Sequence, residues 1–321
     1  MKTFLLVLLA CLGVATAHAA EKKIIFLAGP PSHPSGQHEA RAGLMLFQKL
    51  LADVPGLKIE VHNFDRAWVE DEKVFDDATA VVLYSDGAGG HPFLRPGRLA
   101  KIGALMAKGV SLGLIHYAVE PTKEQGQPEF IAWTGGAFEG YYSVNPIFDG
   151  EFKSLPTHPI TRGVKPFSAR DEWYYHIRFR ENMAGVTPIL TLVPPLTSLN
   201  RPNPPKPDDA PRLREGNPSV YAAVLKQEPE PVMWVTERPD GGRGFGFSGG
   251  HFHANWGGAD QRKLMLNAIL WLARLEVPAN GVESIVTPED LQANLDVKAA
   301  RGRGAPPPPA KATSAPGLEK K

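Results

Sequence analysis

Residues 80–120 read AVVLYSDGAGGHPFLRPGRLAKIGALMAKGVSLGLIHYAVE, and this stretch decides the fold. The apolar runs at 80–84 and 110–115 are short and are followed by turn-forming or polar residues, which indicates two buried strands. Apolar residues recur at helical spacing over 95–108, and Gly109 ends the predicted helix. A strand, a helix and a second strand in this order predict a parallel sheet with helices on its faces.

The same alternation extends to both sides of this stretch. Further strands are predicted at 23–27, 57–62, 186–193, 232–236 and 244–248, and further helices at 38–52, 259–275 and 289–295. The stretch 199–218 is rich in Pro, Asn and Asp, which is typical of a long surface loop. The predicted fold class is therefore α/β.

The first residues are predicted to be a targeting segment. Residues 1–19 combine a positive start, a compact apolar run and a small-x-small site at 17–19, which is typical of a secretory signal peptide. The sequence before Cys11 is similar to a lipoprotein box, so lipidation of Cys11 stays an alternative. We expect an exported protein, periplasmic or secreted, with no transmembrane segment.

The rest of the chain divides into three predicted parts. The folded domain covers about 23–275, and a peripheral region over 276–298 holds a short helix that Thr287 caps. Residues 299–321 are rich in Pro, Ala and Lys and are predicted to be a disordered tail.

Composition excludes two classes of function. The chain of 321 residues has 35 Lys and Arg against 34 Asp and Glu, so a basic nucleic-acid binder is not expected. Cys11 is the only cysteine, and it lies in the predicted signal peptide. Once that peptide is removed, the protein has no disulfide, no thiolate metal site and no cysteine nucleophile.

Histidines gather where predicted strands end. Six of the 10 histidines lie at such positions: His33, His38, His91, His116, His251 and His253. In open α/β sheets, ligands bind beyond the carboxyl ends of the strands. Histidine transfers protons near neutral pH and binds metal ions, so several that converge indicate a site. A single histidine there is more often a structural residue.

The segment 171–176, DEWYYH, adds acids and aromatic rings. Acids act as bases or bind hydroxyls, and aromatic faces pack against sugars; a solvated acidic turn before an edge strand explains the pattern equally well. The glycine runs at 87–90 and 249–250 match neither a dinucleotide fingerprint nor a P-loop, and we expect tight turns there.

Four ordered motifs resemble the ThuA-like (trehalose utilisation) family. They are GLIHYAVE at 113–120, HPITRG at 158–163, DEWY at 171–174 and GRGFGFSGGH at 242–251. The resemblance covers about 23–275 and implies a flavodoxin-like three-layer sandwich with a mostly parallel central sheet, as in class I glutamine amidotransferases. It also implies a role in carbohydrate catabolism, including disaccharides oxidised to 3-keto forms.

The resemblance also bears on the chemistry. Amidotransferases of this fold carry a cysteine nucleophile after a central strand, and His116 occupies the matching position here. Ser111 lies within the strand and is no substitute, so glutamine amidotransferase activity is not expected.

The site that the resemblance implies is centred on His116 and His251, with Glu120, Asp171 and Glu172 as catalytic neighbours. Substrate-binding candidates are the other polar and aromatic residues expected near this edge of the sheet: His33, His38, Glu39, Arg41, His91, Tyr174, His176, His253 and Trp256.

The leading hypothesis is an exported isomerase, lyase or hydrolase that acts on a (keto-)sugar or glycoside. His116 or His251 would transfer a proton next to a sugar carbonyl, assisted by a carboxylate. No cofactor is certain, although a divalent metal ion held by histidines and a carboxylate would stabilise the developing charge. One alternative is a non-catalytic carbohydrate-binding or accessory module, and another is a degenerate scaffold in a larger complex. The expected partner is a small-molecule carbohydrate.

Overall fold

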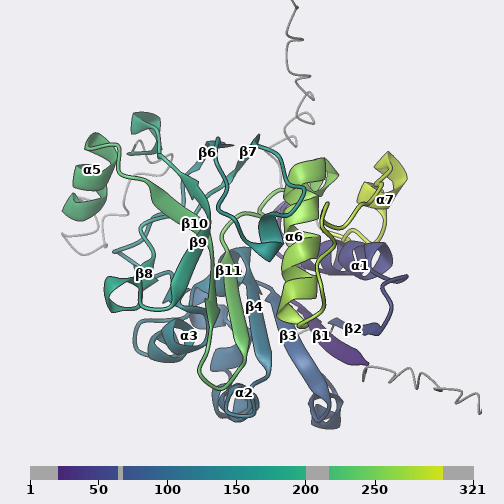
Figure 1. Cartoon of the computed structure of the whole chain (residues 1–321). Helices are drawn as coiled ribbons and strands as arrows, with labels where there is room; N and C mark the ends of the chain where they lie inside the picture. Colours follow the sequence, from purple (N-terminus) through teal and green to yellow (C-terminus); the bar gives the residue numbers. More distant parts are fainter. Residues whose placement is uncertain (1–20, 64–67, 200–216, 299–321) are drawn as a thin grey trace, which may run out of the picture.

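The structure is a computed structural model that describes residues 21–63, 68–199 and 217–298. Seven strands form its main sheet: β1 (Lys22–Ala28), β2 (Leu57–Asn63), β3 (Ala78–Tyr84), β4 (Ser111–Ile115), β9 (Val186–Leu192), β10 (Glu230–Glu237) and β11 (Arg243–Phe247). They lie side by side in the order β2-β1-β3-β4-β11-β10-β9 (Figure 1). The strands from β2 to β11 run parallel, whereas β10 is antiparallel to both of its neighbours.

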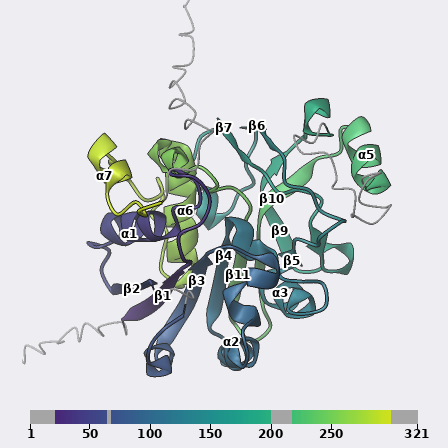
Figure 2. The same cartoon turned by 180° about the vertical axis from the view of Figure 1, so that it is seen from behind.

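Helices cover both faces of this sheet. They are α1 (Ala40–Leu50), α2 (Arg98–Met106), α3 (Gln127–Thr134), α5 (Pro218–Leu225), α6 (Ala259–Leu272) and α7 (Pro288–Gln292). Figure 1 looks onto the face that α6 covers, and the opposite view shows α2 and α3 on the other face (Figure 2). The molecule is therefore a three-layer α/β sandwich, as predicted.

Strand alternation explains the two apolar layers. Ile24 and Phe26 of β1 point to one face and pack in the core that contains α1 and α6. Ile25 and Leu27 point to the other face and pack in the core that contains α2 and α3. All four side chains are fully buried, which is why this strand reads as a continuous apolar run rather than an alternating one.

Two short strand pairs stand outside the main sheet. β5 (Gly136–Ala137) pairs with β8 (Arg178–Phe179), and β6 (Ile147–Phe152) pairs with β7 (Phe167–Glu172). The β6–β7 pair lies at the top of the sheet in both views (Figures 1 and 2). It carries Asp171 and Glu172 at the end of β7, and Asp171 is fully buried. The interpretation of these acids as a solvated turn is therefore wrong.

Every strand and helix that the sequence analysis predicts in the described residues is confirmed, with bounds within three residues of those expected. The cap at Thr287 is confirmed too: its side chain accepts a hydrogen bond from the backbone N–H of Asp290. The prediction did not include α3, α5 or the β6–β7 pair. The predicted signal peptide, the predicted tail and most of the 199–218 loop lie outside the described residues.

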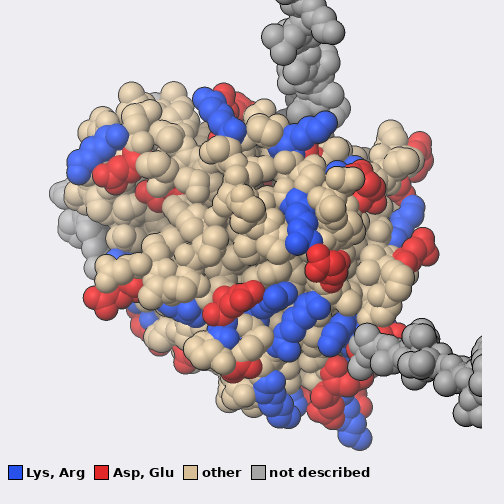
Figure 3. All heavy atoms as spheres, in the orientation of Figure 1, with Lys and Arg blue, Asp and Glu red and all other residues tan. Residues whose placement is uncertain are grey.

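Charges of both signs are mixed on the surface. On the face that Figure 3 shows, Lys and Arg side chains lie beside Asp and Glu, mainly over the lower half. No helix in the described part of the chain is both long and apolar enough to cross a bilayer.

Candidate functional site

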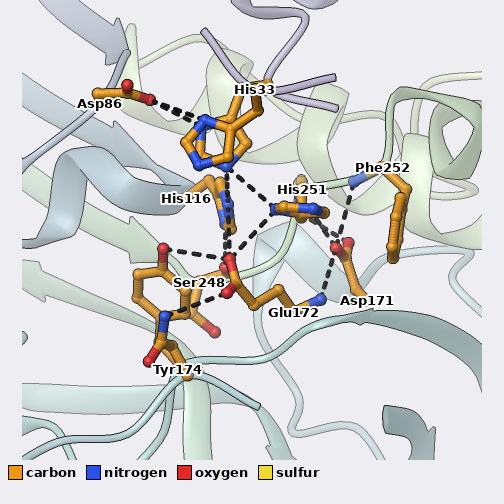
Figure 4. A network of polar contacts seen from close by, with 12 residues as sticks. His33, Asp86, His116, Asp171, Glu172, Tyr174, Ser248, His251 and Phe252 are labelled. Atoms are coloured by element: carbon orange, nitrogen blue, oxygen red, sulfur yellow. Dashed lines mark hydrogen bonds and ion pairs between the residues drawn. The ribbon is translucent and has the colours of Figure 1, made fainter. Parts of the chain in front are cut away.

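Four side chains meet at the carboxyl ends of the central strands (Figure 4). His116 follows β4 directly, and His251 lies in the loop that leaves β11. His38 lies just before α1, and Glu172 is the last residue of β7. We call these four residues the histidine cluster. The prediction that histidines far apart in the chain converge at this edge of the sheet is confirmed for His38, His116 and His251.

The histidine cluster is compact. Nε2 of His38 lies 3.0 Å from Nδ1 of His251 and 3.1 Å from Nε2 of His116. Oε2 of Glu172 lies 3.2 Å from Nδ1 of His251 and 3.4 Å from Nε2 of His116. All four atoms lie within 4.8 Å of one another.

Neighbouring acceptors fix which ring nitrogens carry hydrogen. Nδ1 of His116 lies 2.8 Å from the carbonyl oxygen of Ser248, and Nδ1 of His38 lies 2.7 Å from Oδ1 of Asp86. Carbonyl and carboxylate oxygens only accept, so Nδ1 is the donor in both rings. In the neutral rings Nε2 then bears a lone pair, and the two Nε2 atoms face each other at 3.1 Å. A proton or a cation between them removes the repulsion.

Asp171 holds the loop that presents His251. Its carboxylate accepts hydrogen bonds from the backbone N–H of Gly250 at 2.7 Å and of His251 at 3.0 Å, and from Nδ2 of Asn255 at 3.0 Å. Gly250 has φ +109°, which favours glycine. Its carbonyl accepts a hydrogen bond from the hydroxyl of Tyr84. Asp171 thus positions His251 and is not among the residues that line the cavity.

Three histidines of the site have strained backbones. φ is 60° at His33, 48° at His38 and 58° at His116, in the left-handed region that non-glycine residues rarely adopt. Such strain persists only where the surroundings fix the conformation, and it gathers at functional sites.

A cavity of about 340 Å³ opens beside the cluster. Two cluster residues, His38 and Glu172, form part of its wall, so the cluster faces the cavity. Its lining combines aromatic, hydroxyl, amide and acidic groups and contains neither Lys nor Arg: His33, His38, Tyr117, Glu120, Phe138, Tyr141, Ser143, Asn145, Glu172 and Tyr174. This lining suits an uncharged molecule with hydroxyl groups better than an anion.

Burial and neighbouring charges shift the pKa values of four side chains at the site in different directions. Burial alone would raise the pKa of Glu172, but His116 and His251 hold it well below its usual range. Burial would lower the pKa of His116, yet Glu172 raises it overall. Burial lowers the pKa of His38 to about 3, although the hydrogen bond with Asp86 opposes this. Burial and the charge of Glu172 raise the pKa of Glu120 to about 8, so Glu120 holds a proton at neutral pH.

Two predicted substrate-binding residues have structural roles instead. His91 is fully buried; its Nε2 lies 3.1 Å from the carbonyl oxygen of Ala118, and its Nδ1 accepts a hydrogen bond from the backbone N–H of Phe93. Trp256 is also fully buried and packs edge-on against Phe47. Neither side chain lines the cavity, because apolar neighbours enclose both.

His176 and His253 also lie away from the cavity lining. Nδ1 of His176 lies 3.0 Å from Glu230, and its Nε2 lies 2.9 Å from the hydroxyl of Ser219. The ring of His253 is buried, and burial lowers its pKa to about 4.

Glu39 and Arg41 do not line the cavity either. Glu39 is fully buried, and its carboxylate pairs with Lys298. Arg41 lies in the first turn of α1. Of the predicted substrate-binding residues, His33, His38 and Tyr174 line the cavity, as does the predicted catalytic residue Glu120.

The predicted site residues include five of the ten that line the cavity, and they lack Asp86 and the other five. Asp86 binds His38 and also accepts a hydrogen bond from the hydroxyl of Ser32 at 2.9 Å. It lies two residues after β3, so the same strand-end argument that found the histidines could have found it. Tyr117 and Phe138 carry no comparable signal, since isolated aromatic residues are common in any core.

Comparisons with known proteins place the chain among its relatives. The family model described as ThuA, trehalose utilisation, matches residues 32–272, more than half of the chain. The chain resembles the crystal structure of a ThuA-like protein from Bacteroides uniformis with a TM-score of 0.53 and 18% identity, over 80% of this chain and 93% of that one.

A ThuA-like protein from Parabacteroides merdae shows a TM-score of 0.49 and 13% identity, over 84% of this chain and 94% of that one. At these identities the likeness to the Bacteroides uniformis structure shows the fold. The curated proteins contain no match.

Proposed function

Because the chain belongs to the ThuA (trehalose utilisation) family, we propose that it is an exported enzyme of carbohydrate catabolism that uses a divalent metal ion. The histidine cluster would hold the ion, and the adjoining cavity would hold a neutral sugar that carries a carbonyl group. The reaction would be a proton transfer next to that carbonyl, as in isomerisation or elimination.

One observation carries the metal site: three ring nitrogens and one carboxylate oxygen lie within 4.8 Å of one another, close enough to share one ion. Metal–nitrogen bonds of about 2.0–2.1 Å place the ligands of a regular tetrahedron about 3.4 Å apart. Four of the six separations between these atoms run from 3.0 to 3.4 Å, close to this value. Three imidazoles and a carboxylate suit zinc, manganese, iron, cobalt or nickel rather than calcium or magnesium.

The groups that hold the far nitrogens of these rings support the same assignment. Asp86 holds Nδ1–H of His38, and the carbonyl of Ser248 holds Nδ1–H of His116. Metal-binding histidines are generally oriented by such acceptors on the nitrogen that faces away from the ion. Without an ion, a proton shared between His116 and Glu172 would satisfy the cluster, which keeps metal-free proton transfer by His116 as the competing mechanism.

The remaining chemistry falls to residues of the cavity. A bound divalent ion would stabilise negative charge on the oxygen of the reacting carbonyl. Glu120, protonated at neutral pH, would donate a proton to the leaving hydroxyl in an elimination, or to the former carbonyl carbon in an isomerisation. His33, whose side chain is 37% exposed, is the wall residue placed to accept the proton.

The lining argues for the substrate class. The tyrosine and phenylalanine faces offer stacking surfaces for a sugar ring, and Ser143 and Asn145 offer partners for hydroxyl groups. Among the described residues, the cavity wall contains no Lys or Arg side chain to bind a phosphate or carboxylate. We therefore favour an uncharged keto-sugar or keto-disaccharide. The same aromatic lining favours the second candidate, a carbohydrate-binding module without turnover.

One assay distinguishes metal-dependent catalysis, metal-free catalysis and sugar binding without turnover. The purified full chain is stripped of metal and incubated with 3-keto-disaccharides, with and without added Zn²⁺, Mn²⁺ or Co²⁺. We expect turnover that returns with metal and disappears in His116→Ala. Saturable sugar binding without turnover under any condition would support the binding module instead. Equal turnover with and without chelator would support metal-free proton transfer.

A further inference from the structure

We propose that the C-terminal segment Asp296–Lys298 positions His38 for metal binding, by means of a buried ion pair between Lys298 and Glu39. We call this segment the C-terminal clamp. The inference rests on the proposed function, because it treats His38 as a metal ligand. Glu39 and Lys298 are positioning residues and do not touch the cavity or the other cluster residues.

The ion pair is enclosed by protein. The side chain of Glu39 is 0% exposed and that of Lys298 is 4% exposed, and Nζ of Lys298 lies 3.0 Å from Oε1 of Glu39. Oε1 also accepts a hydrogen bond from the backbone N–H of Gly36 at 2.8 Å, and Oε2 accepts one from that of Asp296 at 2.9 Å. The carboxylate therefore joins the loop before α1 to a segment that lies more than 250 positions away along the chain.

The ammonium group of Lys298 reaches the same loop a second time. It donates to the carbonyl oxygen of Gln37 and lies 3.5 Å from that of His38. The bonds of the clamp thus end on residues 36–39, which include the backbone of the predicted ligand. The clamp contacts main-chain groups of this loop and not the imidazole ring of His38.

His38 needs such support because its backbone is strained. Its φ of 48° lies in the left-handed region, and such a conformation persists only when surrounding contacts fix it. One contact comes from the site side, where the backbone N–H of His38 donates to the carbonyl of His251 at 2.9 Å. The clamp and its partner Glu39 supply further contacts, to the main-chain groups of Gly36, Gln37 and His38.

Stability alone is a weak reason for a buried ion pair. The cost of removing two charges from water offsets most of their attraction, and well-packed apolar residues often serve as well. A buried pair that also fixes three backbone groups beside a strained ligand is better explained by positioning. The clamp also lies outside residues 32–272, the part that the family model matches.

The main test measures Co²⁺ affinity of the full chain by competition with a chromophoric chelator. We expect Lys298→Met to weaken binding about 10- to 100-fold, the range found when groups behind a metal ligand are altered. The double variant Glu39→Gln with Lys298→Met should fall between Lys298→Met and the unaltered chain, because no lone buried charge remains. Lys49→Met is the matched control: it breaks the pair between Lys49 and Asp290, where Asp290 belongs to α7, and should change affinity less than twofold.

A second measurement needs no variant. Coupling between sites is reciprocal, so if the clamp holds His38 for the ion, the ion must also tighten the clamp. We expect Co²⁺ to slow hydrogen exchange at the backbone N–H of Asp296 at least tenfold.

The outcomes are distinct. If the unaltered chain binds Co²⁺ and Lys298→Met binds it equally well, the clamp proposal is overturned and the proposed function stands. If Lys298→Met does not fold, unchanged exchange at Asp296 on Co²⁺ binding would overturn the clamp alone. If the unaltered chain binds no Co²⁺, both proposals fail together.

Discussion

His116 and His91 are two buried histidines that follow neighbouring strands of the main sheet, and they differ in their partners and in their pKa. Both side chains are 0% exposed. His91 is enclosed by Phe93 and Phe130 and bonds only main-chain groups, and burial lowers its pKa to about 3. His116 lies against Glu172, which outweighs burial and raises its pKa.

The difference teaches that position at a strand end does not make a functional histidine. What separates His116 from His91 is the carboxylate of Glu172, which comes from the β6–β7 pair rather than from the main sheet. A histidine whose partners are all main-chain amides and phenyl rings stays neutral and structural. Three experiments would break or sharpen this contrast.

The largest effect is expected from the two histidines themselves. His116→Ala removes a ligand from the centre of the cluster and should abolish metal binding and turnover, as measured by metal titration and by assay. His91→Phe should keep metal binding while it lowers the free energy of unfolding by about 1–3 kcal/mol, because two buried main-chain groups lose a partner. If His91→Phe folds but no longer binds metal, the distinction between a metal-binding His116 and a structural His91 would be wrong.

The next effect concerns the acceptors behind the histidines. Asp86→Asn should weaken metal affinity about 10- to 100-fold, because it no longer fixes Nδ1–H of His38 with a charged acceptor. Glu230→Gln is the matched control, since Glu230 pairs with His176 outside the cavity lining. Isothermal titration with Zn²⁺ measures both; equal losses in the two variants would contradict the account.

The smallest effect is a pH dependence. The pKa of Glu120 is raised to about 8 in the folded protein, above its value in the unfolded chain. The folded state therefore holds the proton more firmly, so this contribution to stability is complete below the unfolded pKa and is lost as pH rises through about 8. We expect the melting temperature to fall from about pH 5 to pH 8 more steeply than in Glu120→Gln, and turnover of the unaltered chain to fall as Glu120 loses its proton above pH 7. Parallel pH profiles for the two proteins would rule out protonated Glu120 as the donor.

The sheet could be predicted from the sequence because its signals are local. The apolar runs of β1, β3 and β4 and the turn-forming or polar residues that follow them identify each strand without knowledge of its neighbours. Because ligands bind beyond the carboxyl ends of parallel strands, the sequence also predicted that His116 and His251 lie close together, and they do.

The partners of these histidines depend on long-range contacts and could not be predicted in the same way. Glu172 reaches the cluster only because β6 and β7 pair outside the main sheet, and Lys298 reaches Glu39 from the other end of the chain. Asp171 was expected to be catalytic, yet it lies buried beneath the His251 loop as a main-chain acceptor. Trp256 was expected to bind substrate, but its ring is buried in the core.

The central claim is that the histidine cluster binds one metal ion, and a direct measurement is titration of the metal-free full chain with Co²⁺. We expect visible absorption bands of Co²⁺ bound to nitrogen and oxygen ligands, and these bands should saturate at about one equivalent per chain. The bands should be retained in His91→Phe and absent in His116→Ala. A spectrum that does not saturate, or one that His116→Ala leaves unchanged, would contradict the claim.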